Sequence, residues 1–208
     1  MGNNNSNLQT AKNARCDEFY TTYESIEEEL QHYLKHFYGK TVLCNCDDPY
    51  KSNFCRYFVR NFEALGLKRL ICTSYVASEN LSVQMSLFND TRSTSKDGHG
   101  YILDLKKVPH RTNLLSDYDF DSFLKRSQSI RRLHGNGDFR SPECIEYLMK
   151  ADIVVTNPPF SLFKDLVALL VKYQKNYLLI GNQKVSEKSR LPTWDLDVDF
   201  DFSLLRMQ

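Results

Sequence analysis

The 208-residue chain has no long apolar segment, no signal-peptide pattern and no cysteine pair of the CxxC type. No apolar run approaches the roughly 18 residues of a membrane-spanning helix, and the start of the chain is polar and Asn-rich. These absences predict a cytoplasmic protein. Because zinc sites usually show paired cysteine spacings, no metal site is predicted, and the six cysteines are expected to be reduced and packed.

The chain also lacks a strong excess of positive or negative charge, since its formal net charge is only +1. Overall charge therefore neither supports nor excludes binding to nucleic acid, and a binding face would need local clusters. Such clusters can contact DNA, although they are more often solvated surfaces. The basic clusters comprise Lys125, Arg126, Arg131 and Arg132, and further along the chain Lys184, Lys188 and Arg190.

Hydrophobic residues make up 41% of the chain and charged residues 25%, which is ordinary for a globular domain. Short apolar runs alternate with segments whose apolar residues follow helical spacing. This alternation predicts an α/β fold with a mostly parallel sheet and helices on both faces. The expected strands lie at 40–46, 68–75, 152–157 and 176–182, and the expected helices at 24–40, 52–67, 142–150 and 163–173.

Capping residues mark several of these boundaries. Ser52 or Asn53 is the expected N-cap of the helix at 52–67, and Gly66 is its expected C-cap. Ser141 followed by Pro142 has the pattern of a helix start, because proline suits the first helical position.

The alternation is interrupted at about 76–134, where two extended segments predict a hairpin inserted beside the sheet at about 80–110. Residues 1–14 are predicted to be disordered because they have low hydrophobicity and no periodicity. The main domain is therefore expected at 15–190. The remaining tail, 191–208, contains an alternating apolar pattern typical of a half-buried strand.

The most specific motif is "NPPF", Asn157 to Phe160, which directly follows an expected buried strand. Two consecutive prolines restrict the backbone, so the Asn157 carboxamide oxygen and the Pro158 carbonyl can point to one place as two acceptors. Phe160 adds a flat apolar face for a planar ring. With Pro159, these residues form a holder for a planar NH2 group, such as the amine of adenine or a glutamine amide. The alternative is a simple proline stop at the end of the strand.

The same holder can activate an adenine amine. This amine is a poor nucleophile because its lone pair is delocalised into the ring. Two acceptors on its hydrogens favour a pyramidal nitrogen, and preorganised dipoles stabilise the charge that develops. A methyl sulfonium group placed in line would complete a transfer without a nucleophilic serine or cysteine.

Other unusual polar residues also follow expected strands, where open α/β sheets bind their ligands. Asn45, Cys46, Asp47 and Asp48 follow the first strand, and Asp138 follows a Gly-rich turn. Two readings stay open for each carboxylate, since Asp47 and Asp48 can instead cap the next helix and Asp138 can be a turn residue.

These motifs resemble those of the EcoRI-type adenine-specific DNA methyltransferases. The segments that carry the resemblance are "CDEFYTTYESIEEEL", "VLCNCDDPYKSNF", "GNGDFRSPECIEYLMKADIVVTNPPFSLF" and "YLLIGNQ", in that order. The resemblance implies a Rossmann-like methyltransferase that uses S-adenosylmethionine. Its implied substrate is the N6 amine of an adenine flipped out of double-stranded DNA.

The resemblance also implies roles for individual residues. The implied catalytic residues are Asn157, Pro158, Pro159 and Phe160, of which Asn157 also contacts the cofactor. The implied cofactor-binding residues are Phe19, Tyr20 and Thr21 at the methionine end, Cys46, Asp47 and Asp48 in place of a Gly-rich loop, and Asp138 and Phe139 at the adenine.

The sequence departs from the family's pattern in three places. The cofactor loop has no glycine, and "CTSY" at the end of the second strand has no acidic residue for the ribose hydroxyls. The tail at 191–208 does not look like the strands and the target-recognising region that family members normally have after "LLIGN". We therefore expect a C-terminally truncated form, or one that needs a second chain for target recognition; the sequence leaves the oligomeric state open. The alternatives are a methyltransferase for RNA adenine or protein glutamine, and a non-catalytic cofactor-binding or DNA-binding module.

Overall fold

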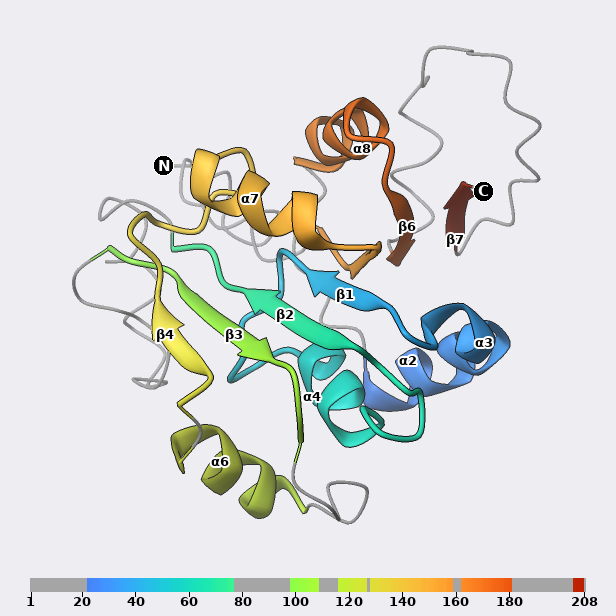
Figure 1. Ribbon diagram of the computed structural model, residues 1–208, viewed down its shortest axis with the longest axis vertical. Helices are drawn as coiled ribbons and strands as arrows, with labels where there is room; N and C mark the ends of the chain where they lie inside the picture. Colours follow the sequence, from blue (N-terminus) through green and yellow to red (C-terminus); the bar gives the residue numbers. More distant parts are fainter. Residues whose placement is uncertain are drawn as a thin grey trace, which may run out of the picture.

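Short apolar runs of the chain form one sheet in the computed structural model, which describes residues 22–76, 98–108, 116–126, 128–158, 162–180 and 204–207. Within these residues the sheet has seven strands in the order β4-β3-β2-β1-β5-β6-β7 (Figure 1). Its central strands run parallel to one another and are β2 (Arg69–Thr73), β1 (Thr41–Cys44), β5 (Ile153–Thr156) and β6 (Asn176–Ile180). The outer strands are antiparallel to their neighbours and are β3 (Tyr101–Leu105), β4 (Ile130–Arg132) and β7 (Leu204–Met207).

The central strands form where the sequence predicts them, because each is a short aliphatic run that can be buried on both faces. All four residues of β1 are buried, which is typical of a strand covered by helices on both sides. The strand ends at Cys44, so the prediction that it extends to Cys46 is wrong at its last residues. Asn45 and Cys46 form a turn, and this turn places the Cys46 side chain in the cluster on the face opposite to that of Cys44, whereas residues i and i+2 of a continuous strand would share one face.

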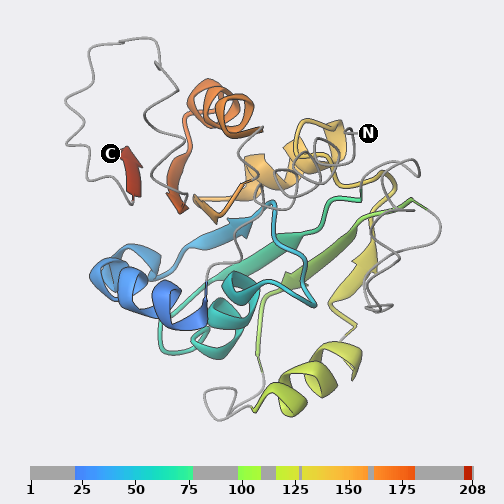
Figure 2. The same cartoon turned by 180° about the vertical axis from the view of Figure 1, so that it is seen from behind.

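Helices cover both faces of the sheet, as predicted (Figures 1 and 2). One face is covered by α2 (Tyr23–Leu30), η1 (Gln31–Tyr33), α3 (Leu34–Phe37), α4 (Asn53–Arg60) and α6 (Asp117–Arg126). The other face is covered by α7 (Pro142–Lys150) and α8 (Phe163–Lys172). Each layer has its own buried cluster, with Phe37, Phe58 and Phe120 on the first face and Leu148 and Leu166 on the second.

The helix starts follow the N-caps that the sequence indicates, whereas the prediction that Gly66 is the C-cap of α4 is wrong, since α4 ends at Arg60 and its C-cap is Asn61. The Ser52 hydroxyl accepts hydrogen bonds from the Phe54 and Cys55 amides, so Ser52 rather than Asn53 is the N-cap of α4. Ser141 caps α7, and Pro142 is its first residue. Two helices are shorter than predicted, since α4 continues as turns to Gly66 and the segment at 24–40 is divided into α2, η1 and α3.

The prediction of a mostly parallel sheet is only partly correct, because three of the six strand pairings among the described residues are antiparallel. The insertion at about 76–134 supplies two of these pairings through β3 and β4, and the described end of the tail supplies the third through β7. Strand β3 pairs with β2 and β4, whereas the first half of the hairpin predicted at 80–110 lies outside the described residues. Ile102, Leu103 and Leu105 are buried, and Asp104 accepts two hydrogen bonds of 2.7 Å from Arg69 of β2, so this strand belongs to the main sheet.

Residues 1–14 and most of the tail at 191–208 lie outside the described residues. The described end of that tail forms β7, which pairs with β6 in register Ile180–Leu204 to Tyr177–Met207. Within the described parts of the chain, no helix is long and apolar enough to cross a membrane.

Candidate active site

The order of the parallel strands places a topological switch between β1 and β5. The chain proceeds from β1 to β2 on one side and later returns to β5 and β6 on the other, with Val42 paired to Ile153 and Leu43 to Val154. Ligands of open α/β sheets bind at the carboxyl ends of the strands beside such a switch. The loop Asn45–Asp48 follows β1 and Asn157 follows β5, so two predicted site segments leave the sheet side by side.

A buried carboxylate joins these two segments. Asp47 is only 5% exposed, and its Oδ2 accepts a hydrogen bond of 2.6 Å from the Thr156 hydroxyl at the end of β5. Its Oδ1 accepts a hydrogen bond of 2.7 Å from Ser52, the N-cap of α4. Asp47 therefore fixes the loop after β1 to the residue that immediately precedes Asn157. The sequence analysis identified Asp47 but not Thr156, whose only signal was a hydroxyl at the end of an otherwise aliphatic strand.

Several backbone amides in and directly after the loop that follows β1 have partners within the protein, and the Asp47 amide donates to the Thr73 carbonyl of β2 at 3.1 Å. The Asp48 carboxylate accepts from the Tyr50 amide at 2.9 Å, and the Asp48 carbonyl accepts from the Lys51 and Ser52 amides. A Gly-rich phosphate loop works differently, because it leaves amide groups free to bind an anion. This loop instead carries two aspartates, and their negative charge favours a cationic or neutral ligand group over an anion, although both Asp47 oxygens already accept hydrogen bonds within the protein. Neither carboxylate caps α4, since Ser52 has that role.

Burial raises the pKa of Asp47 from its ordinary value of 3.8 to about 6, although the hydrogen bonds from Thr156 and Ser52 act in the opposite direction. A carboxylate held in this way lowers protein stability in its ionised form. Groups with a raised pKa are common at functional sites, so this position agrees with the prediction that Asp47 belongs to the site.

Asp47→Asn tests this cost. Because the folded-state pKa is raised, the stabilisation linked to protonated Asp47 is complete below its ordinary pKa of 3.8 and is lost as the pH rises through about 6. The unfolding free energy of the wild type, relative to Asp47→Asn, is expected to fall by about 2 kcal/mol between pH 4 and pH 8. Urea denaturation over a pH series measures this difference.

Asp104→Asn is a matched control, because the pKa of Asp104 is shifted in the opposite direction and its effect on stability has the opposite pH dependence. Partial burial acts to raise the pKa of Asp104, but hydrogen bonds and charge from Arg69 outweigh it, and the pKa is lowered. Its stabilising contribution is present above the ordinary pKa of an aspartate and is lost as the pH falls. Wild-type and Asp47→Asn stability profiles that run parallel across the range would contradict the raised pKa of Asp47.

The turn around Asp138 packs directly on the end of β2. Gly137 has φ +84°, and a Cβ at this position would overlap the Ser74 carbonyl oxygen. The Val76 amide donates to the Asn136 carbonyl at 2.8 Å, which holds the turn against the strand. Tyr75, which the sequence did not indicate as a site residue, is 50% exposed at this point.

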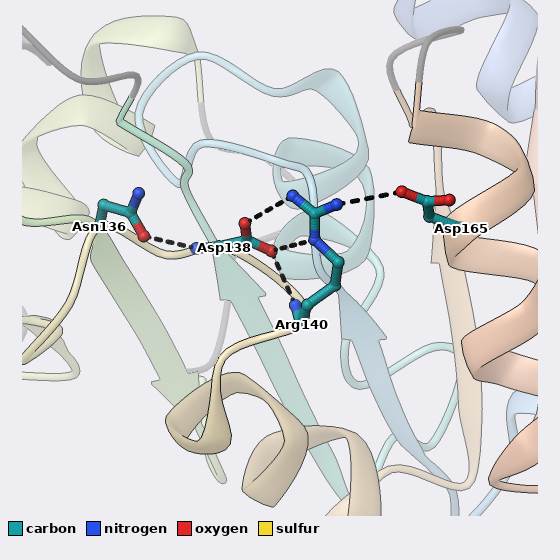
Figure 3. A network of polar contacts seen from close by, with 4 residues as sticks. All are labelled: Asn136, Asp138, Arg140 and Asp165. Carbon is teal, nitrogen blue, oxygen red and sulfur yellow. Dashed lines mark hydrogen bonds and ion pairs between the residues drawn. The ribbon is translucent and has the colours of Figure 1, made fainter.

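The Asp138 carboxylate is engaged by Arg140, two residues further along the turn (Figure 3). Oδ1 accepts from the Arg140 amide at 2.9 Å and from Nε at 3.0 Å, and Oδ2 accepts from Nη2 at 2.8 Å. Hydrogen bonds from the Arg140 side chain lower the pKa of Asp138. Phe139 is buried in the core beneath α7 and α8. Asp138 therefore makes the turn contacts of the alternative interpretation, and because its side chain is still 25% exposed, its role as a cofactor ligand stays a prediction.

The remaining predicted site residues are either described by the structure or lie outside its described parts. Cys46 is half-buried, and burial raises the pKa of its thiol, so the thiol is neutral. Asn157 is half-buried and Pro158 is buried directly after β5. The predicted residues outside the described parts of the chain are Phe19, Tyr20, Thr21, Pro159 and Phe160.

The described cysteines are all free, and no group of histidine, cysteine and carboxylate side chains among the described residues is arranged to hold a metal ion. Cys44, Cys55 and Cys72 are buried together between β1, β2 and α4, and burial raises the pKa of each thiol. These thiols are packed groups of the core.

Comparison with known proteins identifies a family of methyltransferases. Residues 7–189 match the protein family described as adenine-specific methyltransferase EcoRI. The type II methyltransferase M.EcoRI of Escherichia coli is 43% identical over 178 residues, which cover 86% of this chain and 49% of that protein. The type II methyltransferase M.MpnI of Mycoplasma pneumoniae is 39% identical over 172 residues, or 83% of this chain and 42% of that protein.

This chain spans about half the length of the curated relatives that it matches. No solved structure gives a significant match. The family match covers most of the 208 residues, and the chain belongs to the EcoRI family of adenine-specific methyltransferases.

Proposed function

We propose that this chain forms a Rossmann-like methyltransferase domain that transfers a methyl group from S-adenosylmethionine to the N6 amine of adenine in DNA. The observation that carries the proposal is the 2.6 Å hydrogen bond between Thr156 and Asp47. It holds the loop after β1, where a cofactor would bind, against the strand end that leads into Asn157. The relatives that the chain matches are named type II methyltransferases.

The residues at the strand ends fit this cofactor. The loop Asn45–Asp48 contains two aspartates and no basic residue, which suits a ligand that carries positive charge better than a diphosphate. Beside the end of β2, Asp138 retains acceptor capacity for an amine, and the exposed Tyr75 lies next to the same turn. When bound, S-adenosylmethionine supplies an activated methyl group on a positively charged sulfur.

Asn157 and Pro158 would bind the target amine. The Asn157 carboxamide oxygen and the Pro158 carbonyl accept its two hydrogens, and this polarisation makes the nitrogen a better nucleophile as positive charge develops on it. Phe160 would stack on the base. A base in duplex DNA reaches such a holder only after it leaves the stack.

The proposal that the substrate is DNA follows from the family and not from the NPPF segment, because that segment also fits RNA adenine or a glutamine amide. The relatives are about twice as long as this chain. We also include in the proposal a second chain that supplies target recognition.

A methyl-transfer assay tests the function. The chain is incubated with tritiated S-adenosylmethionine and with unmethylated genomic DNA, total RNA or a protein extract, and the label is identified after digestion. The expected product is N6-methyldeoxyadenosine in DNA. Label in RNA or in glutamine would assign the site to another substrate class, and calorimetric binding of the cofactor without transfer would show a non-catalytic module.

A further inference from the structure

Arg140 connects two parts of the candidate site that are distant in the sequence. Its Nε and Nη2 donate to Asp138 in the turn before α7, and its Nη1 donates to Asp165 at 3.0 Å in the first turn of α8 (Figure 3). Its guanidinium also lies 5.4 Å from the centre of the buried Phe139 ring. The guanidinium plane is thus restrained by contacts on three sides.

These contacts leave the Asp138 carboxylate with one defined opening. A carboxylate oxygen has about two lone-pair positions. Oδ1 already accepts two hydrogen bonds, from the amide and Nε of Arg140, whereas Oδ2 accepts one. The side chain of Asp138 is still 25% exposed. One oriented acceptor position on Oδ2 therefore remains for a donor outside this network.

Stability does not account for this arrangement. The side chains of Arg140 and Asp165 are 48% and 54% exposed. Exposed ion pairs contribute little to folding because water and salt screen them. A planar guanidinium with both edges occupied does, however, fix the orientation of its carboxylate partner, which a single ammonium group cannot do.

We propose that Arg140 is a positioning residue that turns one Asp138 oxygen toward the adenine amine of the cofactor, and that Asp165 holds Arg140 in that position. The proposal rests on the proposed function, since it takes Asp138 as the residue that accepts from this amine. Because Asp165 belongs to the helix that follows the NPPF segment, the same contact links the adenine end of the cofactor site to the catalytic segment.

Calorimetric titration with S-adenosylhomocysteine tests the proposal without any need for catalysis. Arg140→Gln is expected to weaken binding about tenfold, and Arg140→Lys should not restore it because an ammonium cannot form the paired contact. Asp165→Asn is expected to weaken binding about threefold. Both residues act through one carboxylate, so the double variant should bind no more weakly than Arg140→Gln alone.

A second probe separates positioning from a general structural role. In S-inosylhomocysteine the amine is replaced by an oxygen that cannot donate to Asp138. The wild type should prefer S-adenosylhomocysteine by about 100-fold, and Arg140→Gln should reduce this preference to about tenfold because Asp138 can then turn away. The thermal unfolding midpoint of Arg140→Gln should remain that of the wild type.

Lys150→Met is the matched control. Lys150 is also 48% exposed, forms an ion pair with Glu146 and lies over a tyrosine ring, but it is at the far end of α7. Normal binding by the wild type and Lys150→Met, with unchanged affinity and preference in Arg140→Gln, would overturn the role of Arg140 and leave the proposed function intact. Absence of binding by the wild type would instead overturn the proposed function and this inference with it.

Discussion

Asn157→Ala is expected to reduce the rate of methyl transfer by about 100-fold to 1,000-fold, because it removes one of the two acceptors that polarise the target amine. Affinity for S-adenosylmethionine should change by no more than about threefold, since the remaining cofactor contacts are preserved. Single-turnover transfer with saturating cofactor measures the first quantity, and calorimetry measures the second.

Asn176→Ala is the control for this change. Asn176 also presents a carboxamide at a strand end, but it is the first residue of β6 at the opposite edge of the sheet, where its amide donates to the Asp152 carbonyl at 3.5 Å. Its substitution should leave the transfer rate unaltered. Equal transfer rates for Asn157→Ala and the wild type would exclude Asn157 from the chemistry.

Gly137→Ala is expected to have the largest effect on stability, at least about 3 kcal/mol of unfolding free energy. The residue has φ +84°, in the left-handed region, and its new Cβ would collide with the Ser74 carbonyl. Because the new Cβ would meet backbone atoms, no flexible side chain can move to relieve the contact. The turn must therefore separate from β2, and Asp138 with it. Urea denaturation measures the stability change, and titration with S-adenosylhomocysteine measures the accompanying loss of affinity.

Gly98→Ala is the control that measures the cost of a positive φ alone, without the contact that a Cβ at position 137 would make with the Ser74 carbonyl. Gly98 has φ +69°, but a Cβ there would meet no atom within 4 Å. Its substitution should cost only about 1 kcal/mol. Similar losses of stability in the two variants would show that the contact with Ser74 is not what requires glycine at position 137.

The elements that the sequence predicted best are those whose signal is local. The runs that form β1, β2, β5 and β6 are apolar because both faces of each strand are covered, and the caps at Ser52 and Ser141 satisfy amides one turn away. Strand pairing is not local. Nothing in the residues at 101–105 states that they pair antiparallel with β2, and the ion pair that fixes this choice spans 35 residues.

The candidate site follows the same rule. The order of the motifs indicated which segments belong to it, and Asp47 could be selected because a carboxylate after a buried strand is unusual. Its partner Thr156 is 109 residues away and could not be inferred from spacing. Arg140 was not selected because an arginine two residues after an aspartate is usually solvated, and only the position of α8 brings Asp165 within reach.

The central claim is that the segments after β1 and β5, together with the Asp138 turn, form one cofactor site. Ultraviolet cross-linking of radiolabelled S-adenosylmethionine to the chain, followed by peptide mapping, tests it most directly. The predicted result is label within 45–52 or 136–160 that excess S-adenosylhomocysteine abolishes. Label confined to peptides elsewhere, or label that the competitor does not reduce, would contradict the claim.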